Sequence, residues 1–475
     1  HPMGSLDLVL SRKRPAGSGH GDILPAEPLI PLSRCPPPGG SLTAATAPSA
    51  VLVAHLPDVG AADDGSDHPD ILHLAARPQP GGVVDALVVA PEDIHMVSMA
   101  QARSRPDIWK VLLWGSQRDL ELLDRLRGRF PSIESHCAHR GWTASQGYKE
   151  KGPGMTDASE LLGMRIIPAE AVGYLQLLQH PAEHAQWAEL HRPRSRKLYS
   201  APLTIIRRTL RRGDITAVTL TEDAVFPSGG VGISGSAKDL GLLQFVAAAT
   251  VSSLGRYWHF MTSASWGVER DFIEVNEFLD LPLPEPNKAQ LDRIRRIINA
   301  IGKSGSTPEL RSSIDDVVFD VYGLTPADRS RVIDRMATAI GRFYGRTPSP
   351  GNTRAMVDQY ESLLSRALEV TLPSLSIETA AQEEGSYRSV AVSLKRRSGQ
   401  NSTTSTEPVH VDMEWMLERL SRDMNNPTAV ISQASGFFID DDTVFLVKTN
   451  DPHRWSRDSA LDDADKIIAA ITSEL

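Results

Sequence analysis

The segment Leu281-Pro282-Leu283-Pro284-Glu285-Pro286 separates two parts of the chain that differ in character. Each residue before a proline is pushed out of the α region, so this segment forms an extended connection. Three helical patterns follow it, over residues 291–301, over residues 310–321, and from Thr325-Pro326 onward. Thr325 suits the N-cap and Pro326 the first helical position of the third helix. The stretch therefore predicts a strap that leads into a helical connector.

Upstream of the strap, residues 130–220 alternate short apolar runs with glycine, proline and basic residues, which favours an irregular α/β module. Helices are expected on both sides of it. Ser116 can cap a helix with Asp119 three residues later, and residues 243–258 place apolar side chains on one helical stripe. Trp258 lies on that stripe, which favours a place in the core.

The two ends of the chain have patterns of their own. Apolar runs at residues 49–54 and 83–89 predict short buried strands, while residues 35–40 read as a proline-rich surface loop. The sequence of the last 120 residues predicts a small α+β module. A mobile polar loop at 397–407 is followed by a helix at 413–420, a strand pair around Asp440-Asp441-Asp442 and a final helix capped at Ser459. We thus expect a mixed α+β fold with domains over 1–100, 101–286, 287–346 and 347–475.

Composition excludes several classes of protein. The 475 residues carry 50 Lys+Arg against 59 Asp+Glu and a net charge of −9, which argues against a surface that binds nucleic acid everywhere. Two cysteines cannot form a disulfide framework, and no apolar run is long enough to span a bilayer, so a cytoplasmic protein without membrane contact is expected. His1-Pro2-Met3-Gly4-Ser5 resembles an expression-vector remnant, so the natural N-terminus is expected to have been altered.

The segment 192–212 is strongly basic in this acidic chain. Such a stripe can release counterions from a phosphate backbone, and arginine can also read guanine in the major groove. The alternative is a solvated basic face that pairs with the Asp-rich C-terminal module. The segment 192–212 contains Arg192, Arg194, Arg196, Lys197, Arg207, Arg208, Arg211 and Arg212.

Two further stretches are candidates for nucleic-acid contact. The glycine-rich residues 140–152 include Tyr148 and Lys149, which suits a loop that closely approaches a ligand, although an ordinary surface turn fits equally. Trp266 and Arg270 could lie near bases, because aromatic faces stack on unpaired bases.

The chain shows no complete motif for catalysis, metal binding or cofactor binding. Gly230-Val231-Gly232-Ile233-Ser234-Gly235 matches a cofactor-loop pattern, but no buried parallel strand precedes it, which favours a flexible glycine loop. Ser135-His136-Cys137-Ala138-His139 lacks a second ligand pair at zinc-finger spacing. No nucleophile elbow, Walker A loop or zinc-deaminase motif is present. We therefore predict no catalytic, metal or cofactor residue.

Taken together, these motifs resemble the C-terminal half of large bacterial adenine-N6 DNA methyltransferases, in which a target-recognition domain follows the methylase domain. The resemblance covers roughly residues 100–475. It rests on Trp114-Gly115-Ser116-Gln117-Arg118-Asp119-Leu120, on Gly141 through Gly147-Tyr148, on residues 193–206, Arg256-Tyr257, Glu269-Arg270 and Leu281-Pro282-Leu283-Pro284, on Ile314 to Phe319 with Tyr322-Gly323-Leu324-Thr325, and on residues 445–448, 454–457 and 460–465.

The resemblance implies a DNA-recognition chain of a restriction-modification or anti-phage defence system, with double-stranded DNA as its ligand. Such enzymes carry an S-adenosylmethionine loop and an Asn-Pro-Pro-aromatic motif, and this chain has neither. Residues 42–90 resemble the last strands of a methylase domain. The chain is then no enzyme by itself, and S-adenosylmethionine would bind a catalytic subunit or a missing N-terminal half.

Two other functions stay open at this point. The chain could be a non-catalytic scaffold or sensor subunit of a defence complex, with its basic stripe on a protein partner. It could also be a self-contained methyltransferase that uses residues 230–235 for the cofactor.

Overall fold

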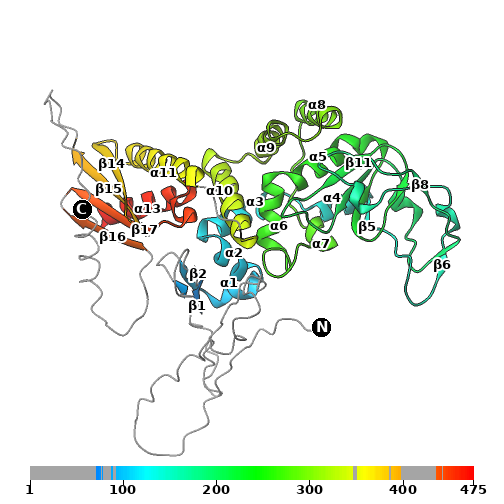
Figure 1. Ribbon diagram of the computed structural model, residues 1–475, viewed down its shortest axis with the longest axis horizontal. Helices are drawn as coiled ribbons and strands as arrows, with labels where there is room; N and C mark the ends of the chain where they lie inside the picture. Colours follow the sequence, from blue (N-terminus) through cyan, green and yellow to red (C-terminus); the bar gives the residue numbers. More distant parts are fainter. Residues whose placement is uncertain are drawn as a thin grey trace, which may run out of the picture.

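The structure is a computed structural model, and it describes residues 71–75, 77–78, 87–88, 93–345, 350–384, 387–396, 435–440 and 442–474. The described part has a mixed α/β fold, as the sequence predicts. Figure 1 shows a small sheet with two helices at one end, an irregular strand-rich region at the other, and a group of helices between them. The expected strand at 49–54, the loops at 35–40 and 397–407 and the helix at 413–420 lie outside the described residues.

The first described strands form two small antiparallel pairs. β1 (Ile71–Leu74) pairs with β4 (Ile94–Val97), and β2 (Arg77–Pro78) pairs with β3 (Leu87–Val88), which lies inside the predicted run 83–89. Four helices follow, namely α1 (Met99–Ser104), α2 (Ile108–Trp114), α3 (Gln117–Arg129) and α4 (Ile133–Arg140). Ser116 and Asp119 form the predicted capping box at the start of α3.

A four-stranded antiparallel sheet lies at the centre of the irregular module. Its order is β11-β10-β13-β5, formed by β5 (Thr143–Gln146), β10 (Leu203–Arg207), β11 (Ala217–Leu220) and β13 (Gly230–Ser234). Between β5 and β10 the chain makes only short strands and single 3-10 turns around a second core, as expected for an irregular segment. The short strands are β6 (Thr156–Asp157), β7 (Arg165–Ile166), β8 (Glu183–His184) and β9 (Glu189–Leu190). A further short strand, β12 (Ala224–Val225), follows β11.

Helices pack against the sheet and lead away from it. The stripe predicted as one helix is two, because Ser252 ends the first and caps the second with its side chain. Trp258 is fully buried, as predicted. The three helices after the strap are confirmed, and Thr325 and Pro326 begin the last of them. The helices are α5 (Leu240–Val251), α6 (Ser253–Thr262), α7 (Val275–Leu279), α8 (Lys288–Ser304), α9 (Pro308–Tyr322) and α10 (Pro326–Phe343).

The proline strap is extended, as predicted, and it is held by hydrogen bonds on both sides. The backbone nitrogen of Ile133 donates to Leu281 O at 3.0 Å, and that of Leu283 donates to Pro131 O at 2.7 Å. The hydroxyl of Tyr322, on α9, donates to Pro282 O at 2.5 Å. The strap therefore fixes α9 relative to α4 instead of acting as a loose linker.

The C-terminal module is an antiparallel sheet of order β14-β15-β17-β16 with two helices packed on it. The strand pair predicted around Asp440 is confirmed, and the last helix begins at Arg457, close to the predicted Ser459. The predicted boundary near residue 347 lies between the end of α10 and the start of α11, where residues 346–349 are outside the described part. The elements are α11 (Pro350–Thr371), β14 (Leu375–Glu384), β15 (Tyr387–Arg396), β16 (Ser435–Asp440), β17 (Thr443–Thr449) and α13 (Arg457–Glu474).

A buried ion-pair network attaches the C-terminal module to the helices. Arg335, on α10, contacts Asp119 of α3 at 2.8 Å and Asp458 of α13 at 2.7 Å. Arg331 contacts Asp458 at 2.6 Å, and the hydroxyl of Tyr257 donates to Asp119 at 2.8 Å. Burial acts to raise the pKa of Asp119, but Arg335 and Arg331 outweigh it and hold that pKa below its usual value.

Within the described residues, no helix combines the length and the apolar character needed to cross a membrane.

Candidate nucleic-acid interface

The central sheet brings several of the predicted basic residues to one of its ends. Arg207 is the last residue of β10 and lies opposite Gly230 of β13. Just beyond β5, the backbones of Lys149 and Arg192 hydrogen-bond to each other in both directions at 3.0 Å. Arg194 then reaches back, and its Nε donates to Gly147 O at 3.5 Å. Residues far apart in sequence therefore meet at this end of the sheet.

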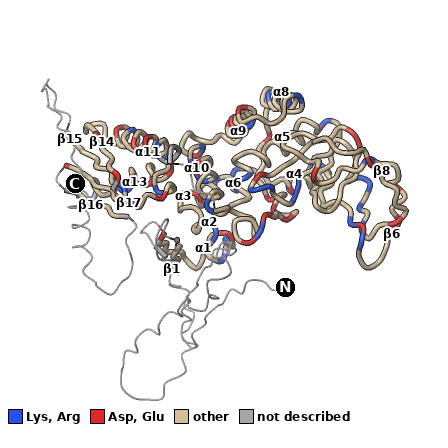
Figure 2. Tube along the Cα trace, in the orientation of Figure 1, with Lys and Arg blue, Asp and Glu red and all other residues tan. Residues whose placement is uncertain are grey.

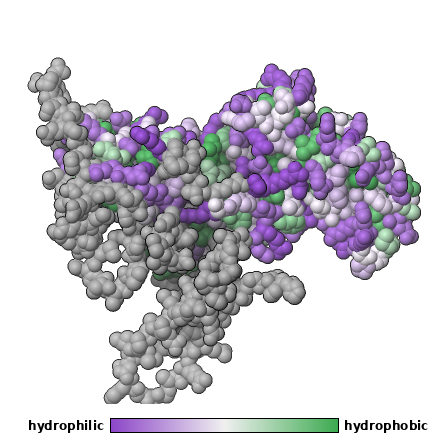
Figure 3. Space-filling model, in the orientation of Figure 1, coloured by the Kyte–Doolittle hydropathy of each residue, from purple (hydrophilic) through white to green (hydrophobic). Residues whose placement is uncertain are grey.

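Most of the predicted basic side chains reach the surface. Figure 2 shows basic and acidic positions interspersed along this region, and Figure 3 shows hydrophilic residues predominating on the visible face of the described body. Lys149, Arg194 and Arg207 are half-buried. The exposed members of the predicted set are Arg192, Arg196, Lys197, Arg211, Arg212 and Arg270.

Arg208 corrects the prediction, because its side chain is buried and has partners inside the protein. Its Nη1 donates to Gln146 Oε1 at 3.1 Å, and its Nη2 forms an ion pair with Glu274. The guanidinium also lies 4.4 Å from the ring centre of Phe272. Successive side chains of an extended segment point to opposite sides, so Arg207 and Arg208 cannot both face outward. Arg208 joins β10 to the start of α7.

The two aromatic candidates are corrected for the same reason. Tyr148 is 4% exposed and packs against Trp187 in the second core. Trp266 is fully buried, edge-on to Phe260. Neither ring presents a face on which an unpaired base could stack. Tyr148 was predicted from the glycine-rich segment around it and Trp266 from its aromatic ring, and burial of their large apolar surface explains their positions better.

Some exposed basic residues are neutralised by neighbours. Arg196 pairs with Asp223 at 3.2 Å and also donates to Glu160 O. Arg270 pairs with the adjacent Glu269 at 3.2 Å. An ion pair of this kind reduces the positive potential available to an anion. These residues are therefore weaker candidates for phosphate contact than Arg192 or Arg211.

Arg207 and Arg211 bring two like charges close together at this end of the sheet. The buried Nε and Nη1 of Arg207 have no hydrogen-bond partner. Burial, and then the nearby charge of Arg211, lower the pKa of the Arg207 guanidinium, and the nearby Glu170 offsets this only in part. A half-buried guanidinium beside a like charge is costly unless an anion joins it. The pair is therefore a candidate anion site.

The backbone beside this pair makes a tight turn. Arg211 and Asp214 exchange backbone hydrogen bonds at 3.2 and 3.1 Å, with Arg212 at φ 52° and Gly213 at φ 84°. The left-handed region suits glycine but is unusual for arginine, so the turn holds Arg212 in a strained conformation. Both Arg211 and Arg212 are presented at the tip of the β10–β11 hairpin.

The glycine-rich segment 230–235 is neither a cofactor loop nor a flexible loop. Residues Gly230–Ser234 form β13, a buried strand that lies between β10 and β5. A Cβ on Gly232 would lie 2.3 Å from the ring of Phe226, so this glycine makes room for that ring. The hypothesis of a self-contained methyltransferase that uses this segment is therefore wrong.

The His-Cys-His cluster has a structural role. The ring of His136 bonds through Nε2 to Leu283 O at 2.8 Å, and so it helps to hold the strap. Burial raises the pKa of the Cys137 thiol to about 11. Among the described residues, no group of His, Cys, Asp and Glu side chains is arranged to hold a metal ion.

The sequence did not single out an exposed apolar face on the β1–β4 pair. Leu72 lies opposite Met96 and Leu74 opposite Ile94, with exposed fractions of 54% and 62% for the first pair. Val97, on the other face, is buried in the main core. The face that packs on the core carries His73 and His95 as well as Val97, so the exposed face is more apolar than the covered one, the reverse of the usual pattern in a surface strand.

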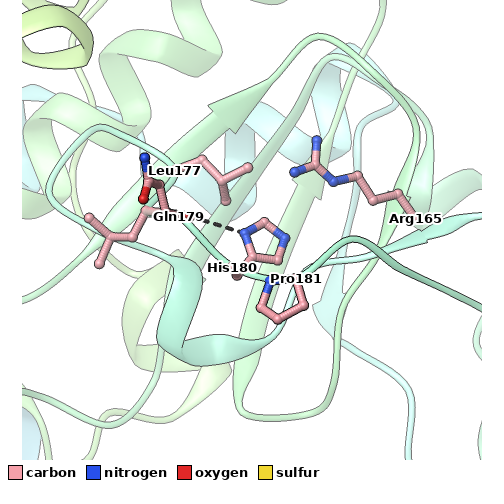
Figure 4. Close-up of a pocket in the computed structure, with 6 residues that line it drawn as sticks. Arg165, Leu177, Gln179, His180 and Pro181 are labelled. Atoms are coloured by element: carbon pink, nitrogen blue, oxygen red, sulfur yellow. Dashed lines mark hydrogen bonds between the residues drawn. The ribbon is translucent and has the colours of Figure 1, made fainter.

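Two adjoining hollows beside β7 were also missed. Their volumes are about 680 and 400 Å³, and Arg165 and Leu177 line both. Figure 4 shows the larger one, in which His180 donates through Nδ1 to Leu178 O at 3.0 Å. Arg165 lies outside the basic segment, so charge clustering gave no signal for it.

Comparison with known proteins identifies no family. No protein-family model matches the chain, and no curated protein matches it. Among solved structures, the HsdS subunit from Thermoanaerobacter tengcongensis aligns at 13% identity with a TM-score of 0.22, over 56% of this chain and 58% of that one. A chain from a study of complex assembly and conformational transition in the type I R-M system aligns at 12% identity with a TM-score of 0.19, over 48% of this chain and 61% of that one. Likeness at this level does not identify a function.

Proposed function

We propose that the chain is the DNA target-recognition part of a site-specific adenine-N6 DNA methyltransferase in a bacterial restriction-modification or anti-phage defence system. The resemblance of its motifs to that group suggests the reaction. Arg207, half-buried beside Arg211 and with two guanidinium nitrogens lacking partners, is the observation that carries the proposal. A phosphate of the DNA backbone would supply the missing acceptors and the opposite charge.

The surrounding residues extend this anion site into a surface. Arg192 and Lys149 are joined by their backbones beyond β5, and Arg212 sits with Arg211 on the hairpin turn. Phosphate contacts of this kind position a protein on DNA, and sequence would then be read by neighbouring side chains. In this proposal the buried side chains of Arg208, Tyr148 and Trp266 support the fold of this surface.

Catalysis requires a second component. The chain lacks the Asn-Pro-Pro-aromatic motif and the S-adenosylmethionine loop, so another chain or a missing N-terminal half would supply both pockets in the cytoplasm. The apolar face formed by Leu72, Leu74, Ile94 and Met96 gives such a component a surface to cover.

The combined variant Arg192→Gln/Arg207→Gln/Arg211→Gln tests this function. We expect its affinity for a mixed-sequence duplex to fall at least about tenfold at low salt, and the salt dependence to become shallower by about one unit of log–log slope for each lost phosphate contact. Fluorescence anisotropy with a labelled duplex measures both quantities.

A matched variant removes the same charge from another surface. Lys288→Gln/Arg296→Gln/Lys303→Gln alters exposed residues of α8 and is expected to change DNA affinity by less than about twofold. Equal losses in the two variants would mean that net charge, not this surface, controls binding. Unchanged binding in the first variant would favour the scaffold or sensor function, with the basic residues on a protein partner.

A further inference from the structure

The hollows beside β7 have the size and lining of a small-molecule site. The smaller one, of about 400 Å³, lies within the range of roughly 300–1,000 Å³ that ligand pockets occupy. Apolar side chains form part of the walls, including Leu177, Leu178 and Pro181 in the larger hollow and Ile298 of α8 in the smaller. Such walls suit the faces of a flat heterocycle.

Two buried polar atoms at the hollow lack a partner. The Nε of Arg165 and the Nε2 of His180 are both buried and make no hydrogen bond. Since Leu178 O can only accept, the bond from His180 Nδ1 places the proton of the neutral ring on Nδ1. His180 Nε2 is then an acceptor, while Arg165 Nε is a donor. A ligand with one acceptor for Arg165 Nε and one N–H donor for His180 Nε2 would satisfy both atoms.

The charges at the site disfavour a phosphate. Glu222 and Asp223 line the smaller hollow together with Arg165. Asp223 is offset by Arg196 on the surface, which leaves Arg165 and Glu222 as opposite charges in the lining. A phosphate would gain from Arg165 but would be repelled by Glu222. A neutral group that both donates and accepts fits this balance better, and Gln176, Thr221 and Asn299 add groups able to bond its edge.

We propose that the two adjoining hollows together bind one nucleobase, with Arg165 Nε donating to a ring nitrogen or carbonyl and His180 Nε2 accepting an N–H. The base could belong to a free nucleoside or to an unstacked position of bound DNA, and only the second source rests on the proposed function. Nucleobases combine apolar faces with donor and acceptor edges, which is the pattern of this lining.

The experiment has one arm for each source. Calorimetric titration with adenosine, guanosine, cytidine and thymidine, with ribose and inorganic phosphate as control probes, tests the free nucleoside. Duplexes that carry 2-aminopurine at successive positions test the DNA source, since its fluorescence rises when the base unstacks. The variants Arg165→Met and His180→Phe remove one partner each, and two variants keep the test available if one of them fails to fold. Arg296→Met is the control.

We expect the chain to bind a nucleoside, and this binding to weaken about tenfold or more in both variants and to stay unchanged in the control. This result supports a free nucleoside as the ligand. A position-specific fluorescence rise that the variants abolish, while anisotropy shows that DNA stays bound, supports the DNA source. If DNA does not bind, the proposed function fails and the nucleoside arm alone decides this inference. Binding of phosphate only, or no response to any nucleoside or 2-aminopurine position, overturns it.

Discussion

Arg335→Met is expected to lower the free energy of unfolding by about 3–5 kcal/mol, because it leaves the buried Asp119 without its ion-pair partner and Asp458 with Arg331 alone. In the native protein the guanidinium lies between Asp119 and Asp458, at 2.8 and 2.7 Å. The side chains of both aspartates are almost completely buried, at 0% and 3% exposed. Methionine keeps most of the volume but supplies neither the charge nor the donors. Urea denaturation followed by tryptophan fluorescence measures the loss.

The matched control is Arg295→Met on α8. Arg295 pairs with Asp292 at 2.6 Å, but its side chain is 57% exposed, and water screens such a pair. Its removal is expected to cost less than about 1 kcal/mol. A loss below 1 kcal/mol for Arg335→Met as well would show that the network does not hold the C-terminal module on α10 and α3.

Gly147→Ala is expected to destabilise the protein by about 3 kcal/mol, because the added methyl group has no room. A Cβ at this position would lie 2.0 Å from the backbone oxygen of Phe226 and 2.6 Å from that of Pro227. These backbone atoms are held by the bridge between Tyr148 and Pro227 and cannot move aside as a flexible side chain would. Gly147 also donates its N–H to Gly230 O at 3.1 Å, so a shift would break the edge of the sheet. Thermal unfolding by circular dichroism measures the effect.

Gly128→Ala is the control, and its expected effect on stability has the opposite sign. This glycine lies in α3 with open space around it, and alanine favours the helical conformation by about 1 kcal/mol relative to glycine. The control variant should therefore be as stable as the parent or more so. If Gly147→Ala were equally harmless, the close approach of residues 147 and 226 would be wrong, and with it the placement of Lys149 and Arg192.

Local signals predicted much of the helical structure. The capping box at Ser116 and the Thr325-Pro326 start are determined by residues within one turn of each helix, so sequence alone suffices. The proline strap is similar, since proline restricts its own backbone and that of its neighbour. The division of the stripe at 243–258 into two helices was missed because Ser252 caps only in the context of a change in chain direction.

Tertiary contacts determine what sequence reasoning could not. The glycines of β13 looked like a loop, because only the ring of Phe226, several residues away and folded back, explains them. The burial of Trp266 depends on its packing against Phe260, and the pairing of Arg208 with Glu274 depends on where α7 begins. The basic segment itself was visible as composition, but which of its charges lack partners required the positions of acidic residues distant in sequence.

The most direct test of DNA recognition is the salt dependence of duplex binding by the unmodified chain. Anisotropy would give the dissociation constant for a mixed-sequence duplex between about 50 and about 200 mM salt, the range over which phosphate contacts lose affinity steeply. The account predicts binding at low salt with a log–log slope of about −3 or steeper, as at least three or four phosphate contacts require. Absent binding, or binding with a slope near zero, would contradict it.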